Sequence, residues 1–520
     1  MPIINSSFVN TAERLKPALR EAAALPTRLV DVVADPDAFQ GWRTEHAGEA
    51  ASLSERAFGK GESFTLDFGD HLVGYVSFAV EAVGSPPDAP LKLKLIFGEM
   101  PCEIGEDFAD YDGWLSSAWL QEETIFLDVL PEVVKLPRRY CFRYMKVQVV
   151  DSSRKYQARF TNFQCTTVTS ADVGNVPPLP SGVPDDLAAM DRIAIKTLQD
   201  CMQTVYEDGP KRDRRLWIGD LRLQAQANYL TFRDRDVVKR CLYLFGGMLL
   251  DTGAVGACVF EKPHAHVDDT WLYDYSLFFA ATLYDYYEAT GDKEALADLW
   301  PVALQQLKLG AERLDERGVA KDDPSWWCFI DWQGELNKQA PAQAVLIYCL
   351  KRGAKLAEAA GDGDAAAWIA ETTRRASEAA IAHLWDAERG VFASGEDRQV
   401  SWASQVWMTL AGVLERADAE ALFERLCANP PAVGMNTPYM YHHYIEALFA
   451  CGSADRAWAE LRAYWGEMIR DGADTFWELY NPNDKSFSPY GSNLINSYCH
   501  AWSCTPTYFI RKYWKRETTA

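Results

Sequence analysis

Residues 173–184 read Val173-Gly-Asn-Val-Pro-Pro-Leu-Pro-Ser-Gly-Val-Pro184, with four prolines in a dozen residues. Proline fixes φ and has no backbone N–H to donate, so this stretch continues neither a helix nor a sheet. It predicts a semi-rigid linker. Because apolar residues alternate before it and recur with a helical period after it, the linker is expected to separate an N-terminal domain, residues 1–172, from a C-terminal domain, residues 185–520.

On the N-terminal side of the linker, short runs of alternating apolar and polar residues are separated by glycine and proline. Such runs predict half-buried antiparallel strands, and their number predicts a β-sandwich. They lie at residues 64–68, 75–80, 91–97, 124–130 and 144–150. A short leading helix is expected over residues 12–24.

On the C-terminal side, the pattern is helical almost throughout. Asp185 or Asp186 is expected to cap the first helix, and Asp220 to begin the next. Further helices are predicted at residues 237–250, 271–290, 294–317, 340–360, 365–384, 401–415, 418–427, 439–451, 454–469 and 495–515. About a dozen helices pair into six hairpins, which predicts an (α/α)6 toroid with a central pocket. An α-solenoid would share this pattern, but the chain shows no fixed repeat length.

The composition limits the partners. The 520 residues carry 74 acidic and 52 basic side chains, a formal charge of -22, which argues against binding nucleic acid or an anionic membrane. Neither a signal peptide nor a membrane-spanning segment is predicted. Twelve scattered cysteines without a C-x-x-C pair indicate reduced thiols and a cytoplasmic protein. The oligomeric state is left open.

The densest mixture of charge and aromaticity is Asp208-Gly-Pro-Lys-Arg-Asp-Arg-Arg-Leu-Trp-Ile-Gly-Asp220. An exposed indole rarely sits among so many charges, so the segment predicts the floor of a polar pocket with one aromatic wall. Such a pocket suits a sugar, whose hydroxyls bind carboxylates while its C–H face packs on a ring. A structural salt-bridge turn is the alternative.

A second acidic and aromatic stretch, Asp471-Gly-Ala-Asp-Thr-Phe-Trp-Glu-Leu-Tyr480, places Glu478 directly after Trp477. A carboxylate beside an indole is a candidate general base, although a solvated loop glutamate is the alternative. His500 follows in Asn496-Ser-Tyr-Cys-His-Ala-Trp502, either as a sugar contact or as a core histidine. Two acidic stretches far apart in the sequence, each with tryptophan, suit cleavage of a glycosidic bond.

Trp271 and Trp332 also lie near carboxylates and are expected to stack against sugar. The spacing of His264-Ala-His266-Val-Asp268-Asp269 fits no zinc template, so neither a metal nor another cofactor is predicted.

The two acidic stretches resemble motifs of the family 78 α-L-rhamnosidases. Residues 208–220 look like that family's Asp-Cys-Pro-x-Arg-Glu-Arg-Leu-Gly-Trp-Thr-Gly-Asp motif without a gap, and residues 471–480 resemble its Gly-Ala-Thr-Thr-Trp-Glu motif. The run Ser497–Trp502 resembles its Ser-x-x-His region. Phe97-Gly-Glu and Phe142-Arg-Tyr-Met-Lys-Val resemble its β-sandwich.

This resemblance implies an inverting glycosidase that needs no metal and releases terminal α-L-rhamnose from oligosaccharides or glycosides. It places Asp213 at the general acid and Glu478 at the general base. It assigns sugar contacts to Asp208, Arg212, Trp217, Asp220 and His500, and Trp477 is added as the neighbour of Glu478.

The chain departs from the family motif at Asp213, where the family has Glu, and at Gly209, where it has Cys. Two alternatives therefore stand beside the rhamnosidase: a related toroid glycosidase of another sugar specificity, and a carbohydrate-binding protein that does not hydrolyse.

Overall fold

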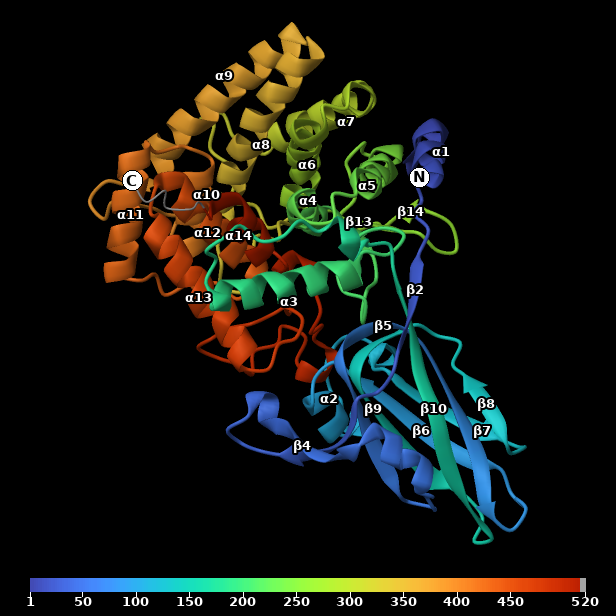
Figure 1. The fold of residues 1–520 in the computed structure, drawn as a ribbon. Helices are drawn as coiled ribbons and strands as arrows, with labels where there is room; N and C mark the ends of the chain where they lie inside the picture. Colours follow the sequence, from blue (N-terminus) through green and yellow to red (C-terminus); the bar gives the residue numbers. More distant parts are fainter. Residues whose placement is uncertain (515–520) are drawn as a thin grey trace.

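The computed structural model describes residues 1–514, and in these residues a β domain and a larger helical domain pack against each other (Figure 1). The β domain contains nine strands in one antiparallel sheet. They are β2 (Arg20–Ala24), β3 (Arg28–Ala34), β4 (Trp42–Glu49), β5 (Ser63–Gly84), β6 (Leu91–Gly98), β7 (Glu122–Leu127), β8 (Glu132–Lys135), β9 (Tyr140–Asp151) and β10 (Tyr156–Thr169). The predicted antiparallel β domain is confirmed.

The long strand β5 organises this sheet, and it joins two runs that the sequence predicts as separate strands. Its first part pairs with β3 and β9, and its second part with β8 and β10. Alternating side chains from both parts, such as Leu66 and Phe78, lie in one apolar core. The sheet therefore wraps around its own hydrophobic face.

The helical domain contains twelve α-helices in the described residues beyond the linker. They are α3 (Asp185–Cys201), α4 (Ile218–Leu230), α5 (Arg235–Gly247), α6 (Tyr273–Thr290), α7 (Lys293–Ala311), α8 (Gln339–Ala360), α9 (Gly363–Ala379), α10 (Trp402–Leu410), α11 (Arg416–Ala428), α12 (Pro438–Cys451), α13 (Ala454–Arg470) and α14 (Pro506–Tyr513).

The helices form a closed double ring. The inner helices α4, α6, α8, α10 and α12 contact one another in turn, and α14 contacts α4 to close the ring. Inner helices are buried on almost every side, as in α4, whereas outer helices such as α3 and α13 bury one apolar face. This arrangement confirms the predicted helical toroid, and it leaves the loops at one end of the inner ring to build a site.

The predicted leading helix over residues 12–24 is wrong. Helix α1 runs over Ser6–Arg14, because Asn5 caps it by accepting hydrogen bonds from the N–H groups of Ser7 and Phe8. Pro17 then ends any helix, and β2 pairs with β10 instead. Helix α1 packs on α5, beside the helical domain rather than the sheet (Figure 1).

Several predicted helix boundaries are also wrong. Helix α3 has Pro184 at its N-cap with no side-chain cap, and Asp185 and Asp186 lie in its first turn. Helix α4 begins at Ile218 rather than Asp220. Helices α7 and α10 end earlier than predicted, α10 because the chain turns at Gly412 with φ +61°.

The largest error concerns the predicted final helix, residues 495–515. The structure has the short 3-10 helix Ala501–Ser503 and α14 there, and residue 515 lies outside the described residues. Residues 496–500 form no helix, because their backbone bonds to two other segments of the chain. The N–H of His500 donates to the carbonyl of Phe476 and that of Ala501 to the carbonyl of Asp208. These bonds bring the two acidic stretches together.

Candidate active site

A cavity of about 540 Å³ opens where the β domain meets the inner ring of helices. The β domain contributes the loop of residues 114–119, and the helical domain contributes the loops before α4, α6 and α8 and the segments before α14. Eight of the ten site residues predicted from the sequence line it: Asp208, Arg212, Asp213, Trp217, Asp220, Trp332, Glu478 and His500. Segments more than 250 residues apart along the chain therefore form one site.

The loop that carries Asp213 is closed on itself. The N–H of Asp208 donates to the carbonyl of Arg215, and the N–H of Arg215 donates to the Asp208 carboxylate at 3.1 Å. Between them, Asp213 and Arg214 both have positive φ, 63° and 56°. Two consecutive non-glycine residues in this region cost free energy, and such strain gathers at functional sites. Here it accompanies the placement of Asp213 in the cavity.

Glu478 is held from two sides. Arg212 Nη2 lies 2.5 Å from Glu478 Oε2, and the Tyr490 hydroxyl donates to Oε1 at 2.5 Å. Burial opposes ionisation of this carboxyl, but the charge of Arg212 and these hydrogen bonds outweigh it and lower the pKa of Glu478. Glu478 is therefore an ionised carboxylate in a nearly dry site, as a general base requires.

Arg212 also lies 3.6 Å from Asp213, measured from Nη1 to Oδ1. One guanidinium thus contacts both candidate catalytic carboxyls, and this limits how far apart they lie. Its Nε–H donates to the carbonyl of Ile495 at 3.1 Å. This hydrogen bond fixes the orientation of the guanidinium between the two carboxyls.

Three further polar groups, Asp208, Asp220 and His500, line the cavity, and burial shifts the pKa of each. Burial raises the pKa of Asp208, with help from the charges of Asp213 and Asp220. Burial and the charge of Glu478 raise the pKa of Asp220 in the same way. Burial lowers the pKa of His500 to about 4, so its ring is neutral at ordinary pH.

Within residues 1–514, the buried atoms Asp220 Oδ1, His500 Nδ1 and Trp217 Nε1 have no hydrogen-bond partner. Buried polar atoms without partners are costly, so a ligand with several hydroxyls would satisfy them. The cavity is therefore prepared for a polar ligand.

The β domain holds the loops that line the cavity in place through Lys211. Its ammonium donates to the carbonyls of Leu494 and Asn496, and it lies 2.5 Å from Glu103 Oε1. Glu99 Oε2 lies 3.9 Å from the same ammonium and accepts a hydrogen bond from the N–H of Tyr498. Both glutamates follow β6. The sheet therefore supports the segments on which Arg212, Asp213 and Glu478 depend.

A buried histidine adds a second link between the domains. His71 of β5 lies 2.6 Å from Asp200 of α3 through Nδ1 and 2.9 Å from Glu99 through Nε2. Its neighbours Cys141 and Cys499 complete two groups of side chains whose ligand atoms lie within 4.8 Å of one another, close enough to hold a metal ion. Sequence spacing gave no sign of this cluster, since its members are far apart in the chain.

Two predicted sugar contacts lie outside the cavity. Trp477 is 1% exposed and stacks on Phe39 with ring centroids 4.4 Å apart, so it belongs to the core. Its neighbour Glu478 lines the cavity instead, so the two adjacent side chains have different surroundings.

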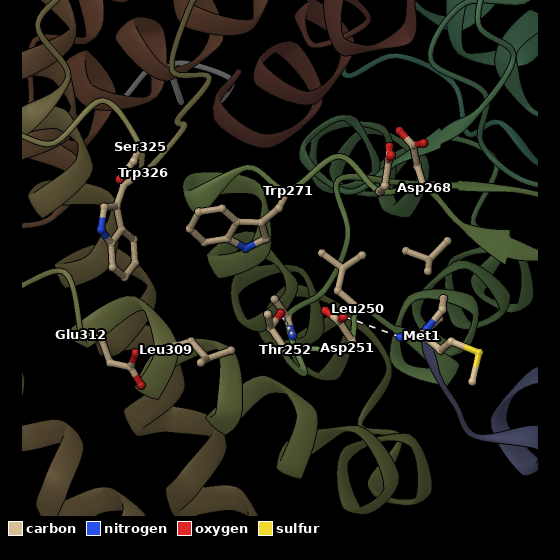
Figure 2. Close-up of a pocket in the computed structure, with 14 residues that line it drawn as sticks. Met1, Leu250, Asp251, Thr252, Asp268, Trp271, Leu309, Glu312, Ser325 and Trp326 are labelled. Atoms are coloured by element: carbon tan, nitrogen blue, oxygen red, sulfur yellow. Dashed lines mark hydrogen bonds and ion pairs between the residues drawn. The ribbon is translucent and has the colours of Figure 1, made fainter.

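Trp271 lines a separate cavity of about 610 Å³ with Trp326 and Asp268 (Figure 2). Its neighbours Thr270 and Leu272 line the first cavity instead. The backbone of this segment thus forms a wall between the two cavities.

Four residues that line the cavity are absent from the set of site residues predicted from the sequence. They are Trp114, Trp327, Asp331 and Tyr490. Asp331 accepts hydrogen bonds from the hydroxyl of Thr437 and the N–H of Asn436, and burial raises its pKa to about 6. Trp327 and Asp331 belong to an acidic and tryptophan-rich stretch that gave a signal, whereas Trp114 and Tyr490 gave none.

Comparison with known proteins agrees with this site. Residues 26–167 match the glycosyl hydrolase family 78 alpha-rhamnosidase N-terminal domain, and residues 184–513 match the bacterial alpha-L-rhamnosidase 6 hairpin glycosidase domain. No curated protein matches.

Among solved structures, a rhamnosidase from Klebsiella oxytoca with rhamnose bound is 50% identical with a TM-score of 0.97, and each chain covers 99% of the other. A family 78 rhamnosidase of Bacillus sp. GL1 is 23% identical with a TM-score of 0.73, over 90% of this chain and 49% of its own, and shows the same fold. The chain therefore belongs to glycoside hydrolase family 78, the α-L-rhamnosidases.

Proposed function

We propose that this protein hydrolyses terminal α-L-rhamnosides with inversion at the anomeric carbon. The observation that carries the proposal is the placement of Asp213 and Glu478 in one cavity, on either arm of the Arg212 guanidinium. The relative from Klebsiella oxytoca, half of whose residues are identical, holds rhamnose. The placement of the two carboxyls and the rhamnose held by this relative together support binding of a rhamnose-sized sugar between Asp213 and Glu478.

In this mechanism Asp213 donates a proton to the glycosidic oxygen as the bond to the anomeric carbon breaks. Glu478 takes a proton from a water molecule that attacks the opposite face of the sugar. Inverting enzymes place the two carboxyls roughly 6.5–9.5 Å apart so that this water fits. The lowered pKa of Glu478 supports its role as the ionised base. Asp208, Asp220 and His500 would bind the sugar hydroxyls.

Two variants and two substrates test these roles. In Asp213→Asn, hydrolysis of methyl α-L-rhamnoside should fall by at least about a thousandfold, and that of dinitrophenyl α-L-rhamnoside by much less, because a good leaving group needs no proton. In Glu478→Gln both substrates should lose activity equally. Equal losses in Asp213→Asn would instead point to Asp208 or Asp220 as the acid.

The stereochemistry is tested directly. Proton NMR of an early reaction mixture should show β-L-rhamnose as the first product, before mutarotation. Release of the α anomer would reject inversion.

The proposal also covers the cellular compartment of the protein and the class of its partner. Each of the twelve cysteines is unpaired, and all but Cys427 are buried. This supports a reducing compartment, the cytoplasm. None of the helices in residues 1–514 combines the length and apolarity that crossing a membrane requires. The formal charge of -22 supports a neutral glycoside rather than nucleic acid as partner.

A further inference from the structure

Two tryptophans stand out by their exposure. The chain has 18 tryptophans, all within residues 1–514, and only Trp114 and Trp327 are exposed, at 66% and 57%. Both line the catalytic cavity. Glu478, in the same cavity, is only 3% exposed. The two indoles therefore lie toward the mouth of the cavity and the carboxylate lies at depth.

Trp114 is fixed to the loop that carries Tyr490. Its indole N–H donates to the carbonyl of Pro489 at 2.8 Å, and its backbone N–H donates to the carbonyl of Tyr490 at 3.1 Å. The polar edge of the indole is thus satisfied while most of its surface remains in water. A side chain held in place before binding loses little entropy when a ligand packs on it.

Trp327 is fixed from the other domain. Its carbonyl accepts a hydrogen bond from the N–H of Tyr273, the first residue of α6, at 2.7 Å. Two residues later, the N–H of Phe329 donates to the Asp274 carboxylate at 2.9 Å. The backbone on which Trp327 stands is therefore anchored to the inner ring, although its side chain is exposed.

Exposed, anchored indoles at the mouth of a deep cavity with carboxylates at its base are typical of binding surfaces rather than of the folded core. We propose that Trp114 and Trp327 form the platform for the leaving group, one indole from each domain. This inference rests on the proposed function, since the rhamnosyl unit must occupy the deep end. The platform selects leaving groups with a flat face, either an aromatic ring or the C–H face of a second pyranose.

The test compares three rhamnosides that differ only in the leaving group: methyl, p-nitrophenyl and glucosyl. In Trp114→Ala and in Trp327→Ala, the ratio of kcat/KM for the two flat leaving groups over that for methyl should fall about three- to tenfold, the range expected for one aromatic contact. A fall confined to the p-nitrophenyl compound identifies aromatic aglycones, and a fall confined to the glucosyl compound identifies sugars.

Conservative variants separate binding from folding. Trp114→Phe and Trp327→Phe keep a flat ring and should restore much of the ratio. Phe126→Ala removes a ring that is 63% exposed on β7, outside the cavity, and should leave the ratio unchanged.

If both alanine variants lose kcat/KM equally on all three substrates, or lose none, the platform is overturned while the proposed hydrolysis stands. A wild-type protein that cleaves none of the three would overturn the proposed function and this inference with it.

Discussion

Arg212 and Glu478, 266 residues apart, form an ion pair of 2.5 Å in which neither side chain is more than 5% exposed. A buried pair of this kind is expensive to assemble, because both charges leave water. Here it keeps the proposed base ionised while the same guanidinium reaches Asp213. The ion pair thus sets the protonation state on which the proposed hydrolysis depends.

Tyr490 should control the acid side of the pH profile. Its hydroxyl stabilises the ionised form of Glu478, so Tyr490→Phe removes one of the interactions that lower the pKa of this carboxyl. The acid limb of kcat/KM should therefore move to higher pH, while the ring that packs on Arg212 is kept. The pH dependence of kcat/KM measures this shift. Tyr156→Phe removes a hydroxyl in the sheet and should leave the limb in place, and an unmoved limb in Tyr490→Phe contradicts the prediction.

Glu103 should stabilise the protein and support catalysis from the other domain. Glu103→Gln leaves the buried Lys211 ammonium with one carboxylate, Glu99 at 3.9 Å, beside its two backbone carbonyl partners. Loss of one partner of a buried pair costs about 3 kcal/mol, so the free energy of unfolding in urea should fall by about that amount and kcat should fall with it. Glu371→Gln breaks an exposed pair with Arg374 and is the control, with no measurable loss expected. Equal stability of both variants would contradict the role of Glu103.

Alanine variants of Trp477 and Trp332 should separate an effect on stability from an effect on substrate binding. Trp477 lies in the core, so Trp477→Ala should lower the free energy of unfolding by about 3–5 kcal/mol without a selective rise in KM in the protein that folds. Trp332 is half-buried and lines the cavity, so Trp332→Ala should chiefly raise KM for rhamnosides. Chemical denaturation and steady-state kinetics of both variants check this. A rise in KM confined to Trp477→Ala would contradict the prediction and would indicate that Trp477 contacts the substrate.

His71 should make the stability of the protein dependent on pH. Burial alone would lower its pKa, but its hydrogen bonds to the buried carboxylates of Asp200 and Glu99 outweigh burial and raise this pKa above the usual value. The charged histidine therefore contributes stability that is full below about pH 6.5, the pKa of an unfolded histidine, and is lost as the pH rises through the folded value. The difference in unfolding free energy between wild type and His71→Gln should be largest at low pH and narrow above neutrality. A difference in unfolding free energy that does not change with pH would contradict the prediction.

The sequence predicted the helical ring because its helices are long and separated by clear loops. It failed at residues 495–515, where side chains are buried without a break from Leu494 to Ile510. Continuous burial removes the period that distinguishes helix from extended chain. This end of the chain hydrogen-bonds instead to the carbonyls of Phe476 and Asp208, which no local pattern reveals.

The candidate site was predictable where motif residues cluster, as at Asp208–Asp220. It was not predictable where the other domain contributes. Trp114 and Glu103 reach the site only because the sheet packs on the ring, and nothing near them in the sequence marks that contact. Trp477 shows the opposite error: it is adjacent to Glu478 in the sequence, but its side chain packs on Phe39 in the core and does not line the cavity.

Lys211 belongs to the loop of one domain and takes its counter-charges from the other. Natural recombination or engineered chimaeras that set this ring of helices on a foreign sheet would leave an ammonium without acids in a dry interior. A functional exchange of domains between relatives should therefore carry Glu99, Glu103 and Lys211 together.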